Sequence, residues 1–282
     1  MSTNKSTFSV SLEVFPPKKE EEFPGAYELL DKLSLLKPEF ISVTYGAGGS
    51  RSKKTVDIAS YIKNTLQIET YAHLTCVGNT RKDIDAVIED LKKANVKNVL
   101  ALRGDRPVYM DDEQYNAREF EHASDLITYL KANTDFHIAG ACYPEKHFEA
   151  PSMSDDIKHL ANKVNAGAEM LITQLFFEND AYYRFEEMVK NAGITVPISA
   201  GIMPITTSKQ LGTTVSLSGS SVPKKLADII ATYDDKPEDM RKAGIDYAIN
   251  QILDLKNHGV NDIHLYSMNK AKTTKEIMDA IR

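Results

Sequence analysis

The chain of 282 residues contains no tryptophan and only two cysteines, Cys76 and Cys142. Neither cysteine lies in a CxxC pair, and no group of cysteines and histidines has the spacing of zinc ligands, so no metal site is predicted. Both cysteines lie in apolar segments, which is typical of small core residues in a reducing compartment.

Long hydrophobic runs are also missing. No apolar stretch approaches the ~20 residues that a membrane helix needs, and residues 1–10 lack the apolar core of a signal peptide. The net charge is -6, with lysine and arginine interspersed among acids, which argues against nucleic acid as the main partner. We therefore expect a cytoplasmic protein that binds neither a membrane nor a nucleic acid.

A regular pattern is present instead: a short apolar run rich in β-formers, a polar loop, and then an amphipathic stretch. Several of the runs are almost continuously apolar, as parallel strands covered on both faces should be. The eight runs are Ser9–Phe15, Phe40–Tyr45, Thr70–Val77, Val96–Arg103, Phe136–Tyr143, Met170–Phe177, Val196–Met203 and Asp262–Met268.

Helical periods lie between these runs, and Thr80 with Asp83 forms a capping box before one of them. Alternating strands and helices predict βαβ units. Eight strands in this length favour an α/β fold of the (β/α)8 TIM-barrel type, with 1–282 as a single catalytic domain. A Rossmann sheet is the alternative, but the only glycine cluster, at 46–49, lacks the GxGxxG spacing. The helical periods cover Ala26–Leu33, Ile84–Leu91, Ala123–Leu130 and Ile245–Ile252.

Residues 204–237 are irregular and rich in threonine, serine and glycine. They predict either a solvated loop with a short helix near Leu226–Ile230, or a cover over the active site, because the segment begins where a strand ends. Both interpretations stay open at this point.

Glu13 is the most telling polar residue, because catalytic groups of a barrel come from the C-terminal ends of its strands. Its neighbours in Val10–Phe15 are mostly apolar. Loss of hydration there would raise the pKa of the carboxyl group and keep it protonated, which suits a general acid. The alternatives are a glutamate on an exposed edge strand or in a buried salt bridge.

A second signal is Arg103-Gly104-Asp105, which ends the fourth run. Arg103 and Asp105 would face the same side of a strand, and Gly104 would let a ligand approach the backbone. The alternative is a structural ion pair at the barrel mouth. The amide of Gln174, at the end of the sixth run, could read the edge of a heterocycle or be a satisfied core amide.

These pieces, taken in order, resemble the bacterial methylenetetrahydrofolate reductases over nearly the whole chain. Each motif alone is weak, but almost every strand end carries one. The motifs are Leu12-Glu13-Val14-Phe15-Pro16-Pro17, Val43-Thr44-Tyr45-Gly46-Ala47, His73-Leu74-Thr75-Cys76, Leu102-Arg103-Gly104-Asp105, Tyr143-Pro144-Glu145, Ala166-Gly167-Ala168, Thr173-Gln174-Leu175-Phe176-Phe177, Gly201-Ile202-Met203-Pro204 and His264-Leu265-Tyr266.

The resemblance implies a TIM barrel that binds FAD, oxidises NADH or NADPH, and reduces methylenetetrahydrofolate to methyltetrahydrofolate. It makes Glu13 the catalytic acid and places Asp105 between flavin and folate. It puts Gln174 and Lys270 at the substrate. The flavin-contacting positions that it implies are Thr44, Tyr45, Ala47, His73, Arg103, Gly104, Asp105, Ala123, Tyr143, His147, Ala150, Asp156 and Lys163.

Some positions depart from the family pattern. Ser208 stands where an aromatic residue is common, His159 and Asn162 replace more basic or polar residues, and Lys270 replaces arginine. The resemblance also implies a homo-oligomer without the C-terminal regulatory domain of eukaryotic members. Another flavin-dependent barrel such as a proline dehydrogenase, a non-redox lyase that uses Glu13 as a base, and a flavin-free binding protein are the alternatives.

Overall fold

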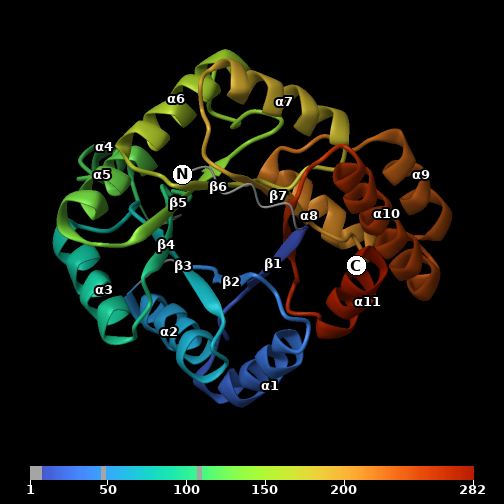
Figure 1. The fold of residues 1–282 in the computed structure, drawn as a ribbon, viewed down its shortest axis with the longest axis horizontal. Helices are drawn as coiled ribbons and strands as arrows, with labels where there is room; N and C mark the ends of the chain where they lie inside the picture. Colours follow the sequence, from blue (N-terminus) through green and yellow to red (C-terminus); the bar gives the residue numbers. More distant parts are fainter. Residues whose placement is uncertain (1–7, 46–48, 107–109) are drawn as a thin grey trace.

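The computed structural model describes residues 8–45, 49–106 and 110–282. Eight parallel strands close into a barrel in sequence order, with the last strand paired to the first. Figure 1 looks down this barrel, with the strands inside and the helices around them. The strands are β1 (Ser9–Val14), β2 (Phe40–Val43), β3 (Glu69–Thr75), β4 (Asn98–Leu102), β5 (His137–Cys142), β6 (Met170–Thr173), β7 (Ile198–Ile202) and β8 (Asp262–Tyr266).

Helices follow the strands and form the outer layer, as a (β/α)8 barrel requires. This confirms the predicted fold class. The longer helices are α1 (Phe23–Ser34), α2 (Gly49–Ser60), α3 (Arg81–Lys93), α5 (Ala123–Asn133), α6 (Met153–Ala166), α7 (Asn179–Asn191), α8 (Ser208–Ser218), α9 (Lys224–Tyr233), α10 (Pro237–Asn257) and α11 (Ala271–Ile281). Shorter turns are η1 (Glu20–Glu22), a π-helical η2 (Tyr61–Thr65) and α4 (Asp112–Asn116).

Side chains alternate along β1 between the helix layer and the barrel interior. Leu12 is fully buried in the main hydrophobic core with residues of the surrounding helices. Its neighbours Ser11 and Glu13 take the other face, and the register with β8 sets them beside His264 and Tyr266. One sector of the barrel interior is therefore polar, although the side-chain layers inside a (β/α)8 barrel usually consist of branched apolar residues.

All eight predicted strands are present, but each ends one to four residues before the apolar run does. The run after β6 shows why: Phe176 and Phe177 are buried as predicted core residues, yet they lie in the loop that leads to α7. The capping box is confirmed, because Thr80 Oγ accepts from the Asp83 amide at 3.2 Å and Asp83 Oδ2 accepts from the Thr80 amide at 2.9 Å. Both cysteines are buried free thiols.

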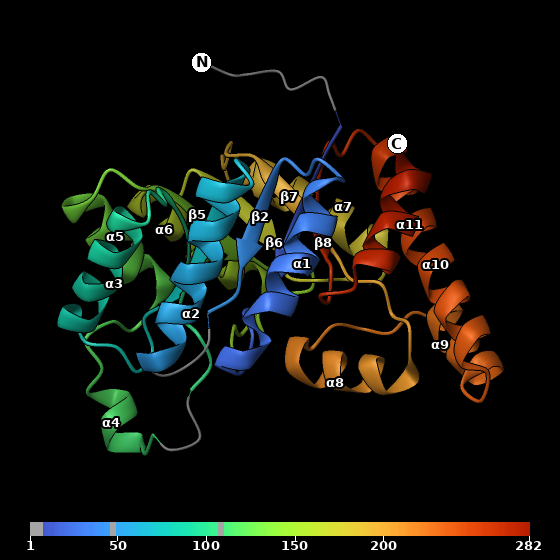
Figure 2. The same cartoon turned by 90° about the horizontal axis from the view of Figure 1, so that it is seen from below.

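The prediction for 204–237 was wrong in part, because the segment forms two helices, α8 and α9, rather than a loop with one short helix. The side chain of Thr207 caps α8 by accepting from the Gln210 amide, and Gly219 ends it with a φ of 69°. Leu211 and Val215 give α8 an apolar stripe, which is too short for a helical period to be recognised in the sequence. Figure 2 places α8 and α4 beyond the same end of the barrel, opposite the end at which β1 begins.

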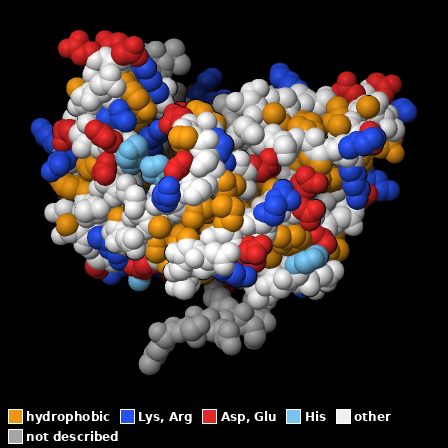
Figure 3. All heavy atoms as spheres, turned by 90° about the horizontal axis from the view of Figure 1, so that it is seen from above, with side chains coloured by type: hydrophobic (Ala, Val, Ile, Leu, Met, Phe, Trp, Pro, Cys, Tyr) orange, Lys and Arg blue, Asp and Glu red, His pale blue; other side chains and the backbone are white. Residues whose placement is uncertain are grey.

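The face shown in Figure 3 gives no sign of a concentrated charge among the described residues. Acidic and basic side chains are intermixed on the face shown in Figure 3. Among the described residues, no helix is both long enough and apolar enough to cross a membrane.

Candidate active site

The C-terminal ends of the strands surround a cavity of about 400 Å³ at the barrel mouth. Ten residues predicted for the site line it together, although they come from β1 to β6 and the loops that follow. They are Glu13, Thr44, Tyr45, His73, Arg103, Gly104, Asp105, Tyr143, His147 and Gln174. The volume lies within the usual range for small-molecule sites, about 300–1,000 Å³.

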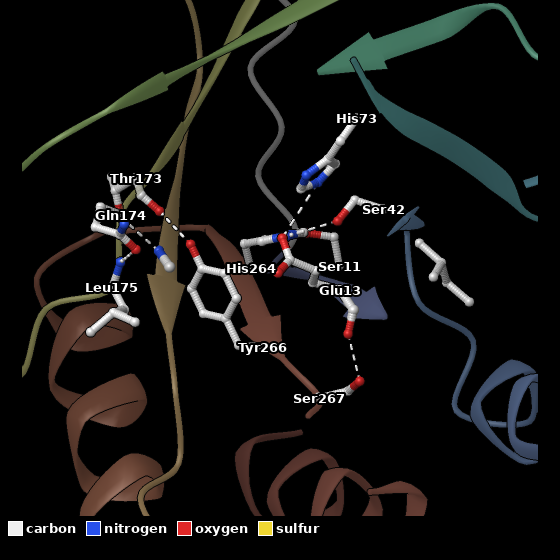
Figure 4. A network of polar contacts seen from close by, with 12 residues as sticks. Ser11, Glu13, Ser42, His73, Thr173, Gln174, Leu175, His264, Tyr266 and Ser267 are labelled. Carbon is white, nitrogen blue, oxygen red and sulfur yellow. Dashed lines mark hydrogen bonds and ion pairs between the residues drawn. The ribbon is translucent and has the colours of Figure 1, made fainter. Parts of the chain in front are cut away.

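Glu13 lies at the floor of this mouth and is 8% exposed. Its Oε2 is 3.4 Å from His73 Nε2 and 3.6 Å from His264 Nε2 (Figure 4). Burial lowers the pKa of His73 to about 4, an effect that the carboxylate of Glu13 only partly opposes. His73 is therefore neutral near pH 7, and Glu13 is not held in a salt bridge with that residue. An exposed edge strand is also ruled out, because β1 is paired on both sides.

His73 has a second notable property. Its Nε2 is buried and has no hydrogen-bond partner among the described residues. An unsatisfied buried nitrogen costs free energy, about 1–3 kcal/mol. His73 lines the mouth, and this nitrogen lies 3.4 Å from Glu13 Oε2.

Tyr266 forms the wall opposite His73. Its hydroxyl donates to the Thr173 carbonyl at 2.9 Å, and burial raises the pKa of the phenol well above its usual value. A Cβ on Gly201 would lie 2.4 Å from that carbonyl and 2.9 Å from the Tyr266 ring. Only glycine therefore allows the ring to lie this close to β7. Beside it, Gln174 Oε1 accepts from the Leu175 amide, which leaves its amide NH₂ for a ligand.

The loop after β4 differs from its prediction. Arg103 and Asp105 do not face one side of a strand, because β4 ends at Leu102 and Gly104 takes a φ of 84°. Arg103 instead pairs through both terminal nitrogens with Glu149, and that hydrogen bond raises the pKa of Arg103. Asp105 is exposed. The proposed Arg103–Asp105 ion pair is thus replaced by one with Glu149.

A basic flank lies behind Tyr143. Lys163, on α6, is half-buried, with its Nζ 2.7 Å from the Ala141 carbonyl and 5.5 Å from the centre of the Tyr143 ring. Burial lowers the pKa of Lys163 and also that of His147. Asp156 accepts from the His147 amide at 3.0 Å and so fixes the loop that carries His147.

The remaining predicted flavin positions lie outside the lining of the mouth. Asp156 and Lys163 support it from behind, and Ala123 and Ala150 are nearly buried at 9% exposure each. Ala47 falls outside the described residues. Lys270 is exposed at the start of α11, and its Nζ donates to Thr206 Oγ1 at 2.9 Å.

A second cavity, of about 540 Å³, adjoins the first on the side of α8. Glu13, Gln174 and Tyr266 line both cavities, so the two spaces meet at these three residues. The outer wall is formed by α8 and its approach, including Met203, Thr207, Gln210 and Thr214. Ser208 does not line this space, since its hydroxyl bonds Asp234.

Sequence reasoning did not predict the helix α8, although it left open that residues 204–237 cover the active site, and it gave no role to Ser11 or His264 inside the barrel. The signal for α8 was too weak to read, since Ser, Thr and Gly dominate its sequence. His264 could have been found from its position, because a histidine two residues before Tyr266 must point to the same face of β8. No group of three or more His, Cys, Asp or Glu among the described residues is placed to hold a metal ion.

Known proteins of one family are similar to this chain over most of its length. A family profile described as methylenetetrahydrofolate reductase matches residues 1–282. The chain is 36% identical over 269 residues to 5,10-methylenetetrahydrofolate reductase of Escherichia coli (strain K12), which covers 95% of this chain and 89% of that protein. It is 33% identical to methylenetetrahydrofolate reductase (NADH) 1 of Arabidopsis thaliana, covering 98% of this chain and 48% of that protein.

A solved structure shares the fold at a TM-score of 0.65 and 18% identity, with 99% of this chain and 95% of that chain covered. It is an uncharacterized protein from Clostridium thermocellum, described as binding two copies of 5-methyl-5,6,7,8-tetrahydrofolic acid. At that identity the likeness supports the barrel fold alone. The sequence matches support membership of a family as well as the fold, because they extend over almost the whole chain and include the strand-end motifs. The chain belongs to the methylenetetrahydrofolate reductase family.

Proposed function

We propose that this protein reduces 5,10-methylenetetrahydrofolate to 5-methyltetrahydrofolate, with FAD as the hydride carrier and NADH or NADPH as the donor. The observation that carries the proposal is the pair of adjoining cavities that meet at Glu13, Gln174 and Tyr266. A redox cofactor and a second reactant need such neighbouring spaces, and a buried acid belongs at their junction.

The residues around the mouth fit a flavin. His73 offers an unsatisfied nitrogen, and Gly104 takes a positive φ in a place where a Cβ would lie 2.8 Å from Val77 Cγ1. Arg103 and Lys163 supply positive charge and His147 supplies a ring nitrogen on one flank, as the phosphates of FAD require. When bound, FAD would accept a hydride from the nicotinamide and pass it to the folate.

The chain's own residues then divide the remaining work. Glu13 donates a proton to the folate nitrogen on the p-aminobenzoate side, which opens the five-membered ring to an electrophilic iminium. The exposed carboxylate of Asp105 stabilises that positive charge. The free amide of Gln174 orients the heterocycle, and Lys270 sits at the rim with its charge available to the folate carboxylates. Protonation of Glu13 at neutral pH stays a prediction.

Two further findings support a folate substrate and a nicotinamide donor. The Clostridium thermocellum protein that shares the fold is described as binding 5-methyltetrahydrofolate. The names of plant relatives include NADH, as in methylenetetrahydrofolate reductase (NADH) 1 of Arabidopsis thaliana. The family match favours this activity over a proline dehydrogenase, a lyase or a flavin-free binding protein.

The test separates the two half-reactions in Glu13→Gln. Reduction of the flavin by NADH should stay within about twofold of wild type, whereas oxidation of the reduced flavin by methylenetetrahydrofolate should slow by at least ~100-fold, the usual contribution of a general acid. Stopped-flow absorbance of the flavin follows both steps. Glu145→Gln is the matched control, because Glu145 lies at the same barrel end, accepts from the Ser221 amide and lines neither cavity.

In the control variant both half-reactions should match wild type. Two results would contradict the proposal. One is a purified protein that neither contains nor takes up FAD. The other is a Glu13→Gln variant that reduces the folate at the wild-type rate.

A further inference from the structure

A buried imidazole lies in the barrel interior between the two ends of the molecule. His264 is 0% exposed and sits in the middle of β8. Its Nδ1 is 2.7 Å from Ser11 Oγ, and its Nε2 is 3.6 Å from Glu13 Oε2. Figure 4 shows Ser11, His264 and Glu13 close together, with Ser42 and His73 beside them. The two ring nitrogens thus face in different directions.

Ser11 connects this imidazole to the opposite end of the barrel. It lines a cavity of about 1040 Å³ that is bordered by the first residues of the strands. Ser9 and Asp262 line the same cavity, and Ser9 Oγ donates to Asp262 Oδ1 at 2.6 Å. Lys97 and His137 border it as well, so the space is polar and wide enough to hold water.

A structural role alone would not require this arrangement. Ser42 Oγ lies 3.2 Å from His264 Nε2, and the ring of Phe40 stacks on the imidazole with 5.6 Å between ring centres. These contacts are enough to hold a histidine in place. Ser11 Oγ lies 3.2 Å from the Ile263 carbonyl as well as 2.7 Å from His264 Nδ1, so its hydroxyl proton can be donated to either acceptor, while Nε2 faces the catalytic acid. A chain of exchangeable protons from the N-terminal cavity to Glu13 would explain this arrangement.

We propose that Ser11 and His264 form a proton path that restores the proton of Glu13 from the N-terminal cavity while ligands occupy the C-terminal mouth. The inference rests on the proposed function, in which Glu13 loses one proton to each folate. With flavin and folate bound above it, Glu13 has its access to solvent blocked on that side. The path through the barrel stays open because the N-terminal cavity is separate from the mouth.

The proton balance is as follows. Ser11 Oγ–H passes its proton to His264 Nδ1 and takes one from water in the N-terminal cavity. The Nε2–H bond of His264 breaks, and that proton binds the Glu13 carboxylate. A movement of about 0.5 Å brings Oε2 and Nε2 to hydrogen-bond distance. The imidazole is left with its proton on Nδ1. It returns to the starting tautomer when the mouth opens, as Nε2 takes a proton from the mouth side and Nδ1 releases one through Ser11.

The first measurement needs no cofactor. In protein labelled with ¹⁵N-histidine, NMR should find His264 neutral with its proton on Nε2, because Ser11 then donates to Nδ1. The signal is assigned by its loss in His264→Gln. A resting imidazole with the proton on Nδ1 would have no donor toward Glu13, and that result would overturn the proposal even if the folate activity is present.

The second measurement follows proton uptake in a single turnover of the protein with reduced flavin. A pH indicator and the flavin absorbance are recorded together, and product release is timed separately. In wild type, proton uptake should precede release of 5-methyltetrahydrofolate. In Ser11→Ala, uptake before release should slow on the order of 100-fold, the scale of a lost proton-transfer partner. Ser11→Thr keeps the hydroxyl and should restore the wild-type rate.

Ser42→Ala is the matched control. It removes a hydroxyl that touches the same imidazole but does not line the N-terminal cavity, so uptake should remain fast. The relay is wrong if Ser11→Ala takes up its proton as fast as wild type, or if Ser42→Ala delays uptake equally. A reduced flavin that methylenetetrahydrofolate does not oxidise would instead refute the proposed function, and the tautomer measurement would still decide on the relay.

Discussion

Gly104 offers a quantitative test of how the mouth is built. Its φ of 84° is disfavoured for residues with a side chain, at a cost of about 1–2 kcal/mol. A Cβ there would also lie 2.8 Å from Val77 Cγ1 and 3.0 Å from Thr75 Cβ. Forcing such contacts in a packed region costs about 1–3 kcal/mol. Gly104→Ala should therefore lower the free energy of unfolding by about 2–5 kcal/mol.

The same substitution should weaken flavin binding, because Gly104, Thr75 and Val77 all line the mouth. Displacing them by a few tenths of an ångström should cost at least ~10-fold in FAD affinity, or about 1.4 kcal/mol. Gly193→Ala is the matched control, since Gly193 has a φ of 75° but nothing within 4 Å of its Cβ position. Gly193→Ala should lower the free energy of unfolding only by the cost of the positive φ, about 1–2 kcal/mol, and should bind FAD with the wild-type affinity.

Urea unfolding and titration of the apoprotein with FAD provide the two readouts. The reasoning fails if Gly104→Ala costs no more stability than Gly193→Ala. It also fails if both variants bind FAD with the wild-type affinity.

Three further predictions concern charged and titratable groups of the mouth. Lys163→Met should keep the fold but lose FAD on dilution, with an affinity cost of about 1.5–3 kcal/mol measured by fluorescence titration; unchanged affinity would remove Lys163 from the flavin site. Burial lowers the pKa of His73 to about 4 in the folded protein, so below about pH 6.5 the unfolded chain binds a proton that the folded protein does not. The free energy of unfolding should therefore be highest above about pH 6.5 and fall by about 3 kcal/mol as the pH falls to 4. Denaturation across this range should show a shallower loss in His73→Gln than in wild type, and equal slopes would refute the assignment. Asp105→Asn should raise the flavin's reduction potential and slow folate reduction without lowering the melting temperature, because Arg103 pairs with Glu149 instead; an unchanged potential in a redox titration would count against Asp105.

The sequence by itself determined the architecture of this protein and ten of the residues that line its mouth. Eight apolar runs separated by helical periods fix a parallel barrel, because both faces of such strands must be covered. Since catalytic groups gather at the C-terminal strand ends, Glu13, His73, Tyr143 and Gln174 could be chosen before any coordinates were known. Each of these residues has a local signal in the sequence, because it is a polar side chain in or just after an apolar run. The alternation of side chains along a strand then indicates which way it points.

The tertiary structure alone decided what lies across space. Arg103 pairs with Glu149, 46 positions further along the chain, and no local pattern connects the two. The helix α8 forms because Leu211 and Val215 pack against a distant cluster, although its own sequence has little periodicity. His264 meets Ser11 across 253 positions, because barrel closure brings the last strand beside the first. Contacts of this kind depend on the register between strands, which short-range periodicity does not encode.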